Sequence, residues 1–537
     1  MEKVVLYTSY EEVPYHSLSN PYSHPANMAT VATLLGLEVP PVRTCRVLEL
    51  GSGTGPNLLP MAASLPEAEF VGIDLSPRQV AISRQGAEEL GLRNVRFLEM
   101  NLLDVDAELG RYDYIIAHGM YSWLPPPVRD KLLAICRDHL VEHGLAYVSY
   151  NTYPGWHLTN VLRDLLLYRV RGLKTPEERV EAAMEALNLL VEGPTDRSDP
   201  PARLMRDYAR VYGRTLGQLG PHMASSLHHD LLAETNDPVY FEQFVAHAES
   251  HHLSYVAEAP FQLTLPQEIP KQIRDRLGSF VDNNIEMEQY GDFLRMRTFR
   301  QSLLCHAGRS IDRSLDPARV RTLWARSVLK PVSSRPELNA PSVERFSGPD
   351  GKSLVTNHPV SKAALTILAE EHPRSVAFSD LLQAARQRLG QDPVQGDQDC
   401  SSPDAEELAR TLLRTFSQQR QLITLRALAP KLARAAPERP VALPVARWQA
   451  RRTSVVTNGY HEAASLTPLQ HCTLTLLDGT RGRQELLAEL SRLAEQGVLT
   501  MERGGRRVED PVEMRPLLEQ QLEEVLAGLV SLGLIMS

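Results

Sequence analysis

The sequence predicts an α/β protein with a doubly wound parallel sheet, a helical insertion and a mostly helical C-terminal region. Three observations support this fold class. Short apolar runs alternate with helical patterns over residues 1–157, a glycine-rich turn follows the first run, and helical periodicity dominates much of the remaining chain. A length of 537 residues allows two to four domains. We expect three regions, which are residues 1–157, 158–325 and 326–537.

Five apolar runs in the first region are expected to be strands: residues 45–50, 69–74, 95–100, 112–117 and 144–151. Helices are expected between them, one beginning after Gly55, one with Ser76 as its N-cap, and one over residues 127–141. Gly91 follows the second helix, where glycine commonly ends a helix. Buried strands separated by helices are typical of a parallel sheet that is covered on both faces.

Residues 158–231 have mostly helical periodicity, and we expect them to be inserted between two strands of the sheet. Residues 240–259 have the pattern of an amphipathic helix that runs into a short strand, and residues 289–304 could supply one more strand. The later part of region 158–325 is therefore expected to complete the core sheet.

The third region alternates linkers with helices. Residues 330–359 and 391–404 are rich in Pro, Ser, Asp and Gln, and residues 428–452 are basic and interrupted by proline, which suggests connections. Residues 362–389 and 467–537 are expected to be helical. Two short strands are expected around Gly504 and Gly505. Helices followed by a glycine-turn hairpin resemble a winged helix.

Composition excludes several classes of protein. Lys and Arg number 57 against 66 Asp and Glu, a net charge of −9, so we expect no nucleic-acid partner. The five cysteines lie far apart and form no CxxC, which disfavours disulfides and structural zinc. The first residues lack the apolar core of a signal peptide, and no run of about 18 apolar residues occurs. These features predict a cytoplasmic protein without a membrane span.

The strongest functional signal is the loop VLELGSGTG, residues 47–55. Glycine is needed where a backbone turns sharply or approaches a ligand closely. The absence of GK[ST] excludes a P-loop, and Pro56 stands where a dinucleotide fingerprint would have its last glycine. Asp74 ends the next strand, where its carboxylate can accept both ribose hydroxyls of a nucleoside.

These features favour S-adenosylmethionine over NAD, because a sulfonium nucleoside has no pyrophosphate to bind. Its amino-acid tail needs an acidic partner, and Glu49 can provide one directly or through water. Asn101 is placed to receive the adenine amino group. His118 and Gly119 end the fourth strand, where donor and acceptor should meet. The predicted cofactor site comprises Glu49, Gly51, Ser52, Gly53, Asn57, Asp74, Leu75, Asn101, Leu102, His118 and Gly119.

The sequence resembles the class I S-adenosylmethionine-dependent methyltransferases, and within them the bacterial group that carries a methyltransferase regulatory domain. The matching stretches are residues 22–27 (YSHPAN), 47–61, 112–124 (YDYIIAHGMYSWL), 147–156 (YVSYNTYPGW), 229–259 and 477–482 (LDGTRG). Asn101 departs from the acidic residue usual at the adenine position of this fold. In this fold the segment before the first strand, here with Tyr15, His16, His24 and Pro25, often lies over the cofactor.

The best-described members of this group methylate lysines of bacterial outer-membrane proteins, so the resemblance implies a protein substrate with a lysine acceptor. Neutral amines are favoured by dry aromatic surroundings. Tyr121, Trp123, Tyr150 and Tyr153 are expected to line the acceptor pocket. No metal is expected, the product would be S-adenosylhomocysteine, and a homodimer is possible. A small-molecule methyltransferase and a non-catalytic regulator that binds the cofactor are the alternatives.

Overall fold

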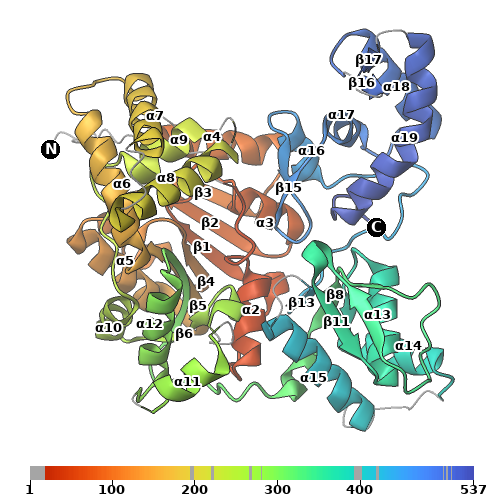
Figure 1. Ribbon diagram of the computed structural model, residues 1–537, viewed down its shortest axis with the longest axis horizontal. Coiled ribbons are helices and arrows are strands. Elements are labelled where there is room, and N and C mark those ends of the chain that lie inside the picture. The colour runs from red at the N-terminus through yellow and green to blue at the C-terminus, as the bar shows by residue number, and fades with distance from the viewer. Residues whose placement is uncertain are drawn as a thin grey trace.

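The computed structural model describes residues 18–193, 199–218, 220, 223–264, 269–279, 281–391, 402–418, 422–499, 501–503, 506–508 and 511–537 (Figure 1). No helix within these residues combines the length and apolar character needed to cross a membrane. The four cysteines in the described part, Cys45, Cys136, Cys305 and Cys472, are buried and unpaired.

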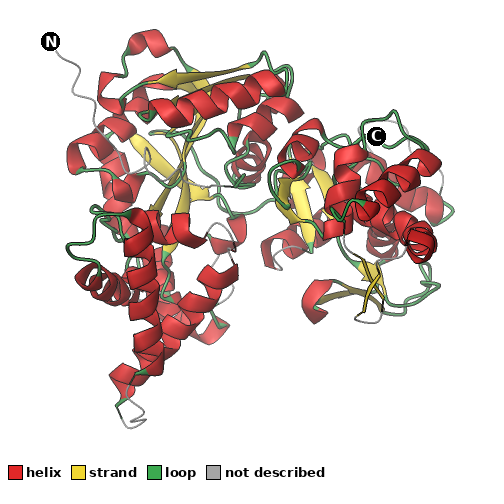
Figure 2. Cartoon of the chain, turned by 90° about the horizontal axis from the view of Figure 1, so that it is seen from above, coloured by secondary structure: helices red, strands yellow, loops and turns green. Residues whose placement is uncertain are grey.

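A seven-stranded sheet forms the centre of the larger lobe (Figures 1 and 2). Its order is β3-β2-β1-β4-β5-β7-β6. The strands are β1 (Arg46–Leu50), β2 (Glu69–Asp74), β3 (Val95–Glu99), β4 (Tyr112–Ala117), β5 (Leu140–Asn151), β6 (Leu253–Glu258) and β7 (Phe299–His306). The neighbouring pairs among β1 to β5 are parallel. The five strands expected from the sequence are therefore confirmed, and strand order reverses beside β1, where such sheets bind ligands.

The last two strands make the sheet mixed rather than parallel, because β7 runs antiparallel to both β5 and β6. The expectation of a strand over residues 289–304 is wrong in its first half. Residues up to 295 belong to helix α12 (Asn284–Arg295), which ends at Met296 in the left-handed conformation. Strand β7 starts three residues later, at Phe299.

Both faces of the sheet are covered by helices. One face packs on α2 (Pro25–Leu34), α3 (Leu58–Ser64) and α4 (Pro77–Glu89), and the other on α5 (Pro126–His139) and α10 (Phe241–Ser250). Consecutive residues of β1 point to opposite faces of the sheet, since Val47 lies in the first core and Leu48 in the second. As expected, Ser76 caps α4 by accepting a hydrogen bond from the Gln79 N–H.

The predicted helical insertion is present between β5 and β6. It comprises α6 (Gly155–Arg169), α7 (Pro176–Glu192), α8 (Pro200–Gln218), α9 (Met223–Ser226) and a single π-helical turn at Leu227–Leu231. These helices share a separate apolar core that includes Trp156 and Leu166. They project from the carboxyl end of β5 (Figure 1). Helix α11 (Lys271–Leu277) precedes α12.

The region beyond residue 325 contains two units rather than one. The first includes β8 (Trp324–Ser327), β9 (Lys330–Pro331), β10 (Glu344–Ser347), β11 (Ser353–Thr356), α13 (Pro359–Glu371), β12 (Val376–Ala377), α14 (Phe378–Arg388), α15 (Pro403–Gln418) and β13 (Ile423–Arg426). Its apolar residues belong to the same core as one face of the large sheet. The boundary expected after residue 325 falls inside β8.

The second unit has its own core and matches the expected winged-helix arrangement. Its elements are α16 (Pro444–Ala450), β14 (Val455–Thr457), β15 (Ala463–Ser465), α17 (Pro468–Leu476), α18 (Arg483–Glu495), β16 (Met501–Arg503), β17 (Arg506–Val508) and α19 (Pro511–Ser531). Strands β16 and β17 form the expected hairpin. Helix α16, inside the stretch expected to be a connection, contacts α3 of the large lobe.

Candidate cofactor and acceptor sites

The glycine loop connects the end of β1 to α3. Gly51, Gly53 and Gly55 all have positive φ, at +69°, +54° and +78°, which other residues adopt only with strain. The N–H groups of Gly51 and Ser52 donate to the Ile73 carbonyl at 2.8 and 3.0 Å, fixing the loop to the end of β2. A Cβ on Gly51 would lie 2.3 Å from the Met120 sulfur. The loop therefore needs glycine for its own geometry as well as for any ligand.

Glu49 lies beneath this loop with only 4% of its surface exposed. Its Oε1 accepts a hydrogen bond from the Asn57 side-chain amide at 2.7 Å, whereas its Oε2 is buried without a partner among the described residues. Burial raises the pKa of this carboxyl to about 8. An unpartnered buried carboxylate oxygen is costly, so this atom is suited to receive a cationic group of a ligand.

Asp74 ends β2 beside the loop. Its Oδ2 accepts the Gly53 N–H at 2.8 Å and its Oδ1 accepts the Ser76 N–H at 2.9 Å. The adjacent Leu75 is exposed. We call Glu49, the loop of residues 51–55 and Asp74 the cofactor cradle. The structure brings these predicted residues together at the carboxyl ends of β1 and β2.

Asn101 and Leu102 follow β3, which is the neighbour of β2 in the sheet. The Asn101 side-chain oxygen accepts the Leu103 N–H at 3.0 Å and so caps a short 3₁₀ turn. Leu102 is buried in the core. The Met100 N–H donates to the Asp74 carbonyl at 2.9 Å, which places this segment directly beside the cradle.

His118 follows β4 and is half-buried. Its Nδ1 lies 3.0 Å from the Tyr147 hydroxyl, 3.1 Å from Ser149 Oγ and 3.2 Å from Asn20 Nδ2. Burial lowers the pKa of the imidazole to about 4, so the ring is neutral at physiological pH. The Gly119 N–H donates to Ser149 Oγ at 2.7 Å. His118 is therefore held in place by hydrogen bonds and is a weak base.

Three residues at the site were not predicted from the sequence. Asn20 and Ser23, from the segment before α2, and His461, from the winged-helix unit, all hydrogen-bond to the Asn57 side chain. The expectation that the segment before the first strand lies over the cofactor gave a signal for Asn20 and Ser23, of which only Ser23 belongs to the YSHPAN stretch. His24 caps α2 and contacts the His461 ring at 5.2 Å. Tyr15 and His16 lie outside the described residues.

The predicted acceptor residues separate into buried and half-exposed pairs. Tyr150 is fully buried, stacks on Phe244 at 4.0 Å and hydrogen-bonds to Ser302 Oγ at 3.0 Å. Tyr121 is also buried, and its hydroxyl lies 2.8 Å from His247 Nδ1. These two rings pack within the core between the sheet and α10, and neither has an open face.

Trp123 and Tyr153 are half-buried and lie closer to the surface. Trp123 meets Trp156 edge to face at 6.5 Å. Tyr153 stacks on the exposed His157 at 4.1 Å and lies 5.4 Å from the Tyr240 ring. Trp123, which follows β4, and Tyr153, which follows β5, therefore each lie against aromatic neighbours near the carboxyl ends of these strands.

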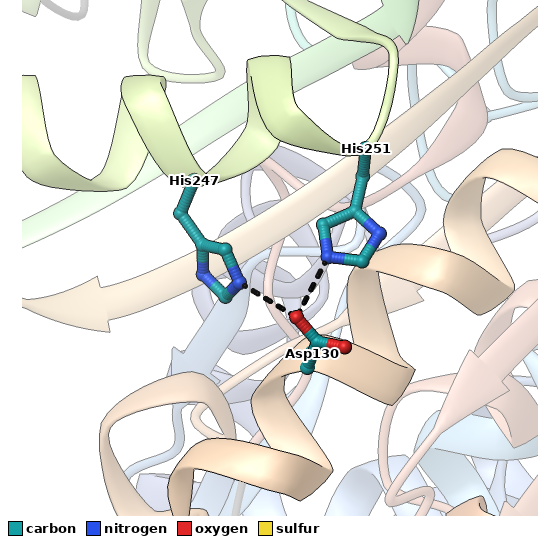
Figure 3. A group of neighbouring side chains, drawn as sticks. All are labelled: Asp130, His247 and His251. Carbon is teal, nitrogen blue, oxygen red and sulfur yellow. Dashed lines mark hydrogen bonds and ion pairs between the residues drawn. The ribbon is translucent and has the colours of Figure 1, made fainter.

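Asp130, His247 and His251 form a cluster between α5 and α10 (Figure 3). Asp130 Oδ1 lies 3.0 Å from His251 Nε2 and 3.5 Å from His247 Nε2. These contacts lower the pKa of the Asp130 carboxyl, and burial lowers the pKa of His247. The i, i+4 spacing puts both rings on one side of α10 with Asp130 Oδ1 between them, whereas His251 Nδ1 has no partner among the described residues.

Comparisons with known proteins agree with this architecture. The description "Methyltransferase domain" matches residues 47–144, "Predicted methyltransferase regulatory domain" matches 223–306, and "PKMT, C-terminal winged helix domain" matches 438–534. Protein RP789 of Rickettsia prowazekii is 30% identical over 517 residues, which are 95% of this chain and 90% of that protein. Protein RP028 of the same organism is 32% identical over 241 residues, covering 45% of this chain and 94% of that protein.

Two solved structures share the whole fold. PKMT2 from Rickettsia typhi matches with a TM-score of 0.84 and 25% identity, over 98% of this chain and 100% of that one. PKMT2 in complex with AdoHcy matches with a TM-score of 0.83, 24% identity and the same coverage. The fold and the cofactor cradle define a class I S-adenosylmethionine-dependent methyltransferase. The chain belongs to the family of these proteins that combines the methyltransferase regulatory domain with the PKMT-type winged helix.

Proposed function

We propose that this protein transfers the methyl group of S-adenosylmethionine to lysine side chains of a protein substrate. The observation that carries the cofactor assignment is the buried Glu49 Oε2, which has no partner among the described residues and lies beneath a loop of left-handed glycines. The sulfonium of the cofactor supplies an activated methyl carbon. Glu49 would hold the amino group of its methionyl part, and Asp74 would hold its ribose hydroxyls.

The protein's part in the reaction is to align the reactants and exclude water. Lysine has an unperturbed pKa of about 10.4 and must lose a proton before attack. Half-exposed Trp123 and Tyr153 offer apolar faces that would desolvate the amine and favour its neutral form. His118 is neutral and hydrogen-bonded, so we assign it to positioning at the methyl-transfer end rather than to proton removal. The buried Tyr121 and Tyr150 would pack behind Trp123 and Tyr153 and support them.

The name PKMT, shared by the matching winged-helix description and by the Rickettsia typhi structures, supports a lysine acceptor. Of the five cysteines, the four in the described part of the chain are unpaired, which supports action in the reducing cytoplasm. The negative net charge supports a protein rather than a nucleic-acid substrate. A homodimer is a further hypothesis, which light scattering of the purified chain tests directly.

The test is transfer of label from methyl-labelled cofactor to bacterial outer-membrane proteins, with hydrolysis to identify methyl-lysine. The same substrate with its lysines acetylated is the matched control and should accept no label. Label found only in small molecules would overturn the lysine assignment in favour of a small-molecule acceptor. Cofactor binding without turnover on either fraction would favour a non-catalytic regulator.

A further inference from the structure

A tight turn of the winged-helix unit reaches the cofactor cradle. The turn, residues 458–462, joins β14 to β15, and the Asn458 side-chain oxygen accepts the N–H groups of Tyr460 and Glu462 at 2.8 and 3.0 Å. At its tip His461 has φ +65°, a left-handed conformation that is uncommon for residues other than glycine, histidine being one of those that adopt it more often. A strained residue at this place suggests that its side chain is required there.

The His461 side chain contacts Asn57, which lies 404 positions earlier in the sequence. Its Nε2 lies 2.7 Å from Asn57 Oδ1, and both residues are buried. The Asn20 backbone N–H, which can only donate, also points at Asn57 Oδ1, at 3.1 Å. This atom is therefore the amide oxygen, and His461 must carry its proton on Nε2.

The orientation of the Asn57 side-chain amide determines which hydrogen bond the Glu49 carboxyl group accepts. With Oδ1 facing Asn20 and His461, the amide NH₂ group donates to Glu49 Oε1 at 2.7 Å and to Ser23 Oγ at 3.0 Å. Oε1 is thereby occupied and Oε2 is left for a ligand. A relay of hydrogen bonds thus runs from His461 through Asn57 to the buried carboxylate.

The surroundings keep His461 in this single state. Burial, and then the nearby Arg426 charge, lower the pKa of His461 to about 3, so the ring is neutral and has one proton to donate. Arg426 Nη1 donates to the Tyr460 carbonyl at 3.1 Å, and Arg326 pairs with Glu462 at 2.9 Å. Through these two contacts, the unit that contains β8 and β13 holds the turn in place beside the large lobe.

We propose that His461 is a positioning residue for cofactor binding, and that seating of turn 458–462 and occupation of the cradle strengthen each other. The inference rests on the proposed cofactor site and adds its regulation by the winged-helix unit. Coupling between two binding events is reciprocal. Whatever displaces the turn would therefore weaken cofactor affinity, and the cofactor would in turn hold the winged-helix unit in place.

The test compares the affinity of full-length variants for S-adenosylhomocysteine by calorimetry. His461→Gly removes the donor and relieves the left-handed strain, so the protein should fold and bind about threefold to tenfold more weakly. His461→Gln offers another N–H donor and should recover part of the loss. Trp448→Phe is the matched control, because it removes a 2.6 Å hydrogen bond to Glu89 across the same interface without touching Asn57. Because turn 458–462 keeps its own contact with Asn57, this variant should lower the affinity much less than His461→Gly does.

A second measurement detects the coupling directly. Amide exchange of residues 455–465 should slow when the ligand is added to the wild type but not to His461→Gly. Equal affinity of wild type and His461→Gly, or an equal loss in Trp448→Phe, would overturn the proposal. If Glu49→Gln also binds normally, the cradle assignment itself fails. If Glu49→Gln binds weakly while His461→Gly does not, only the positioning role fails.

Discussion

The guanidinium group of Arg300 forms a two-pronged ion pair with the carboxylate of Asp292, with Nε–Oδ2 at 2.7 Å and Nη2–Oδ1 at 3.0 Å. Both side chains are fully buried. Glu258 and Glu288 also accept from Arg300, at 2.9 and 3.1 Å, and the guanidinium lies 3.5 Å from the centre of the Phe241 ring. This cluster joins β6, β7, α10 and α12, and so ties the regulatory part of the chain to the sheet.

Replacing Arg300 should destabilise the protein strongly. Arg300→Met leaves Glu288 without its cation and leaves only Arg297 to pair with Glu258 and Asp292, and breaking such a buried pair costs about 3–5 kcal/mol. Urea unfolding measures the change. Lys271→Ala is the control, because it removes an exposed i, i+4 pair with Asp275 that is worth about 0.3–0.5 kcal/mol. Similar losses in both variants would contradict the role assigned to the cluster.

Gly51 should tolerate no side chain. Gly51→Val should abolish cofactor binding, because its Cβ meets the Met120 sulfur and the backbone holds φ +69°. Gly91→Val is matched, since Gly91 has φ +66° but no atom of the described residues lies within 4 Å of the added Cβ. We expect it to lower stability and to leave cofactor affinity intact. Calorimetry on both variants checks this, and normal binding by Gly51→Val would refute the loop assignment.

Asp74→Ala should weaken cofactor binding by about 1.5–3 kcal/mol, the range for a charge-assisted hydrogen bond. Part of the loss would come from releasing the Gly53 N–H that Asp74 now holds. Asp113→Ala is a useful control, because Asp113 also accepts a backbone N–H, that of Arg46 at 2.7 Å, at the opposite end of β1. An unchanged dissociation constant for Asp74→Ala would move the ribose contact elsewhere.

Cofactor affinity should rise with pH up to about 8, the pKa to which burial and the nearby Asp74 charge raise the Glu49 carboxyl. Below that value the carboxyl is protonated, and it must lose the proton to pair with an ammonium group. Glu49→Gln should bind weakly and lose this dependence. Isothermal titration at several pH values measures it, and a flat profile in the wild type would count against Glu49.

The raised pKa of Glu49 also makes the stability of the ligand-free protein depend on pH. The folded pKa of about 8 exceeds the ordinary value of 4.5, so the folded state holds this proton more tightly than the unfolded state. The contribution of Glu49 to stability is therefore full below pH 4.5 and is lost as pH rises through about 8. Thermal unfolding of wild type and Glu49→Gln across this range should show the difference.

Methyl transfer should not need a metal. Asp130, His247 and His251 bring three donor atoms within 4.8 Å of one another, so they are the place to look for an exception. We expect EDTA to leave turnover unchanged and Asp130→Asn to alter it little. A loss of activity on EDTA treatment that zinc restores in the wild type but not in Asp130→Asn would show that the expectation is wrong.

Local patterns were enough to predict the first five strands, the capping role of Ser76 and the residues of the glycine loop. These features depend on neighbours in sequence, such as the apolar run before Gly51 or the serine before Pro77. The start of β7 was misplaced because residues 289–304 contain a helix end and a strand with similar apolar content. Only the left-handed turn at Met296 separates them.

The contribution of His461 could not be predicted, because its partner Asn57 lies 404 positions away and no periodic pattern links them. The burial of Tyr150 was missed for a related reason. Its sequence neighbours place it at the carboxyl end of a strand, but α10, which follows about ninety residues later, covers it through Phe244. Contacts of this kind depend on tertiary packing.

The apolar core shared by the large sheet and residues 324–425 has a practical consequence for dissecting the enzyme. Cutting the chain after β7 would expose a large apolar surface on α2 and α3 to solvent. Fragments with such exposed surfaces aggregate. A fragment that keeps this core intact should instead extend through β13, and because it lacks His461 we expect it to bind the cofactor more weakly. The winged-helix unit, with its separate core, is the part that can be exchanged between relatives to ask which portion of the molecule chooses the substrate.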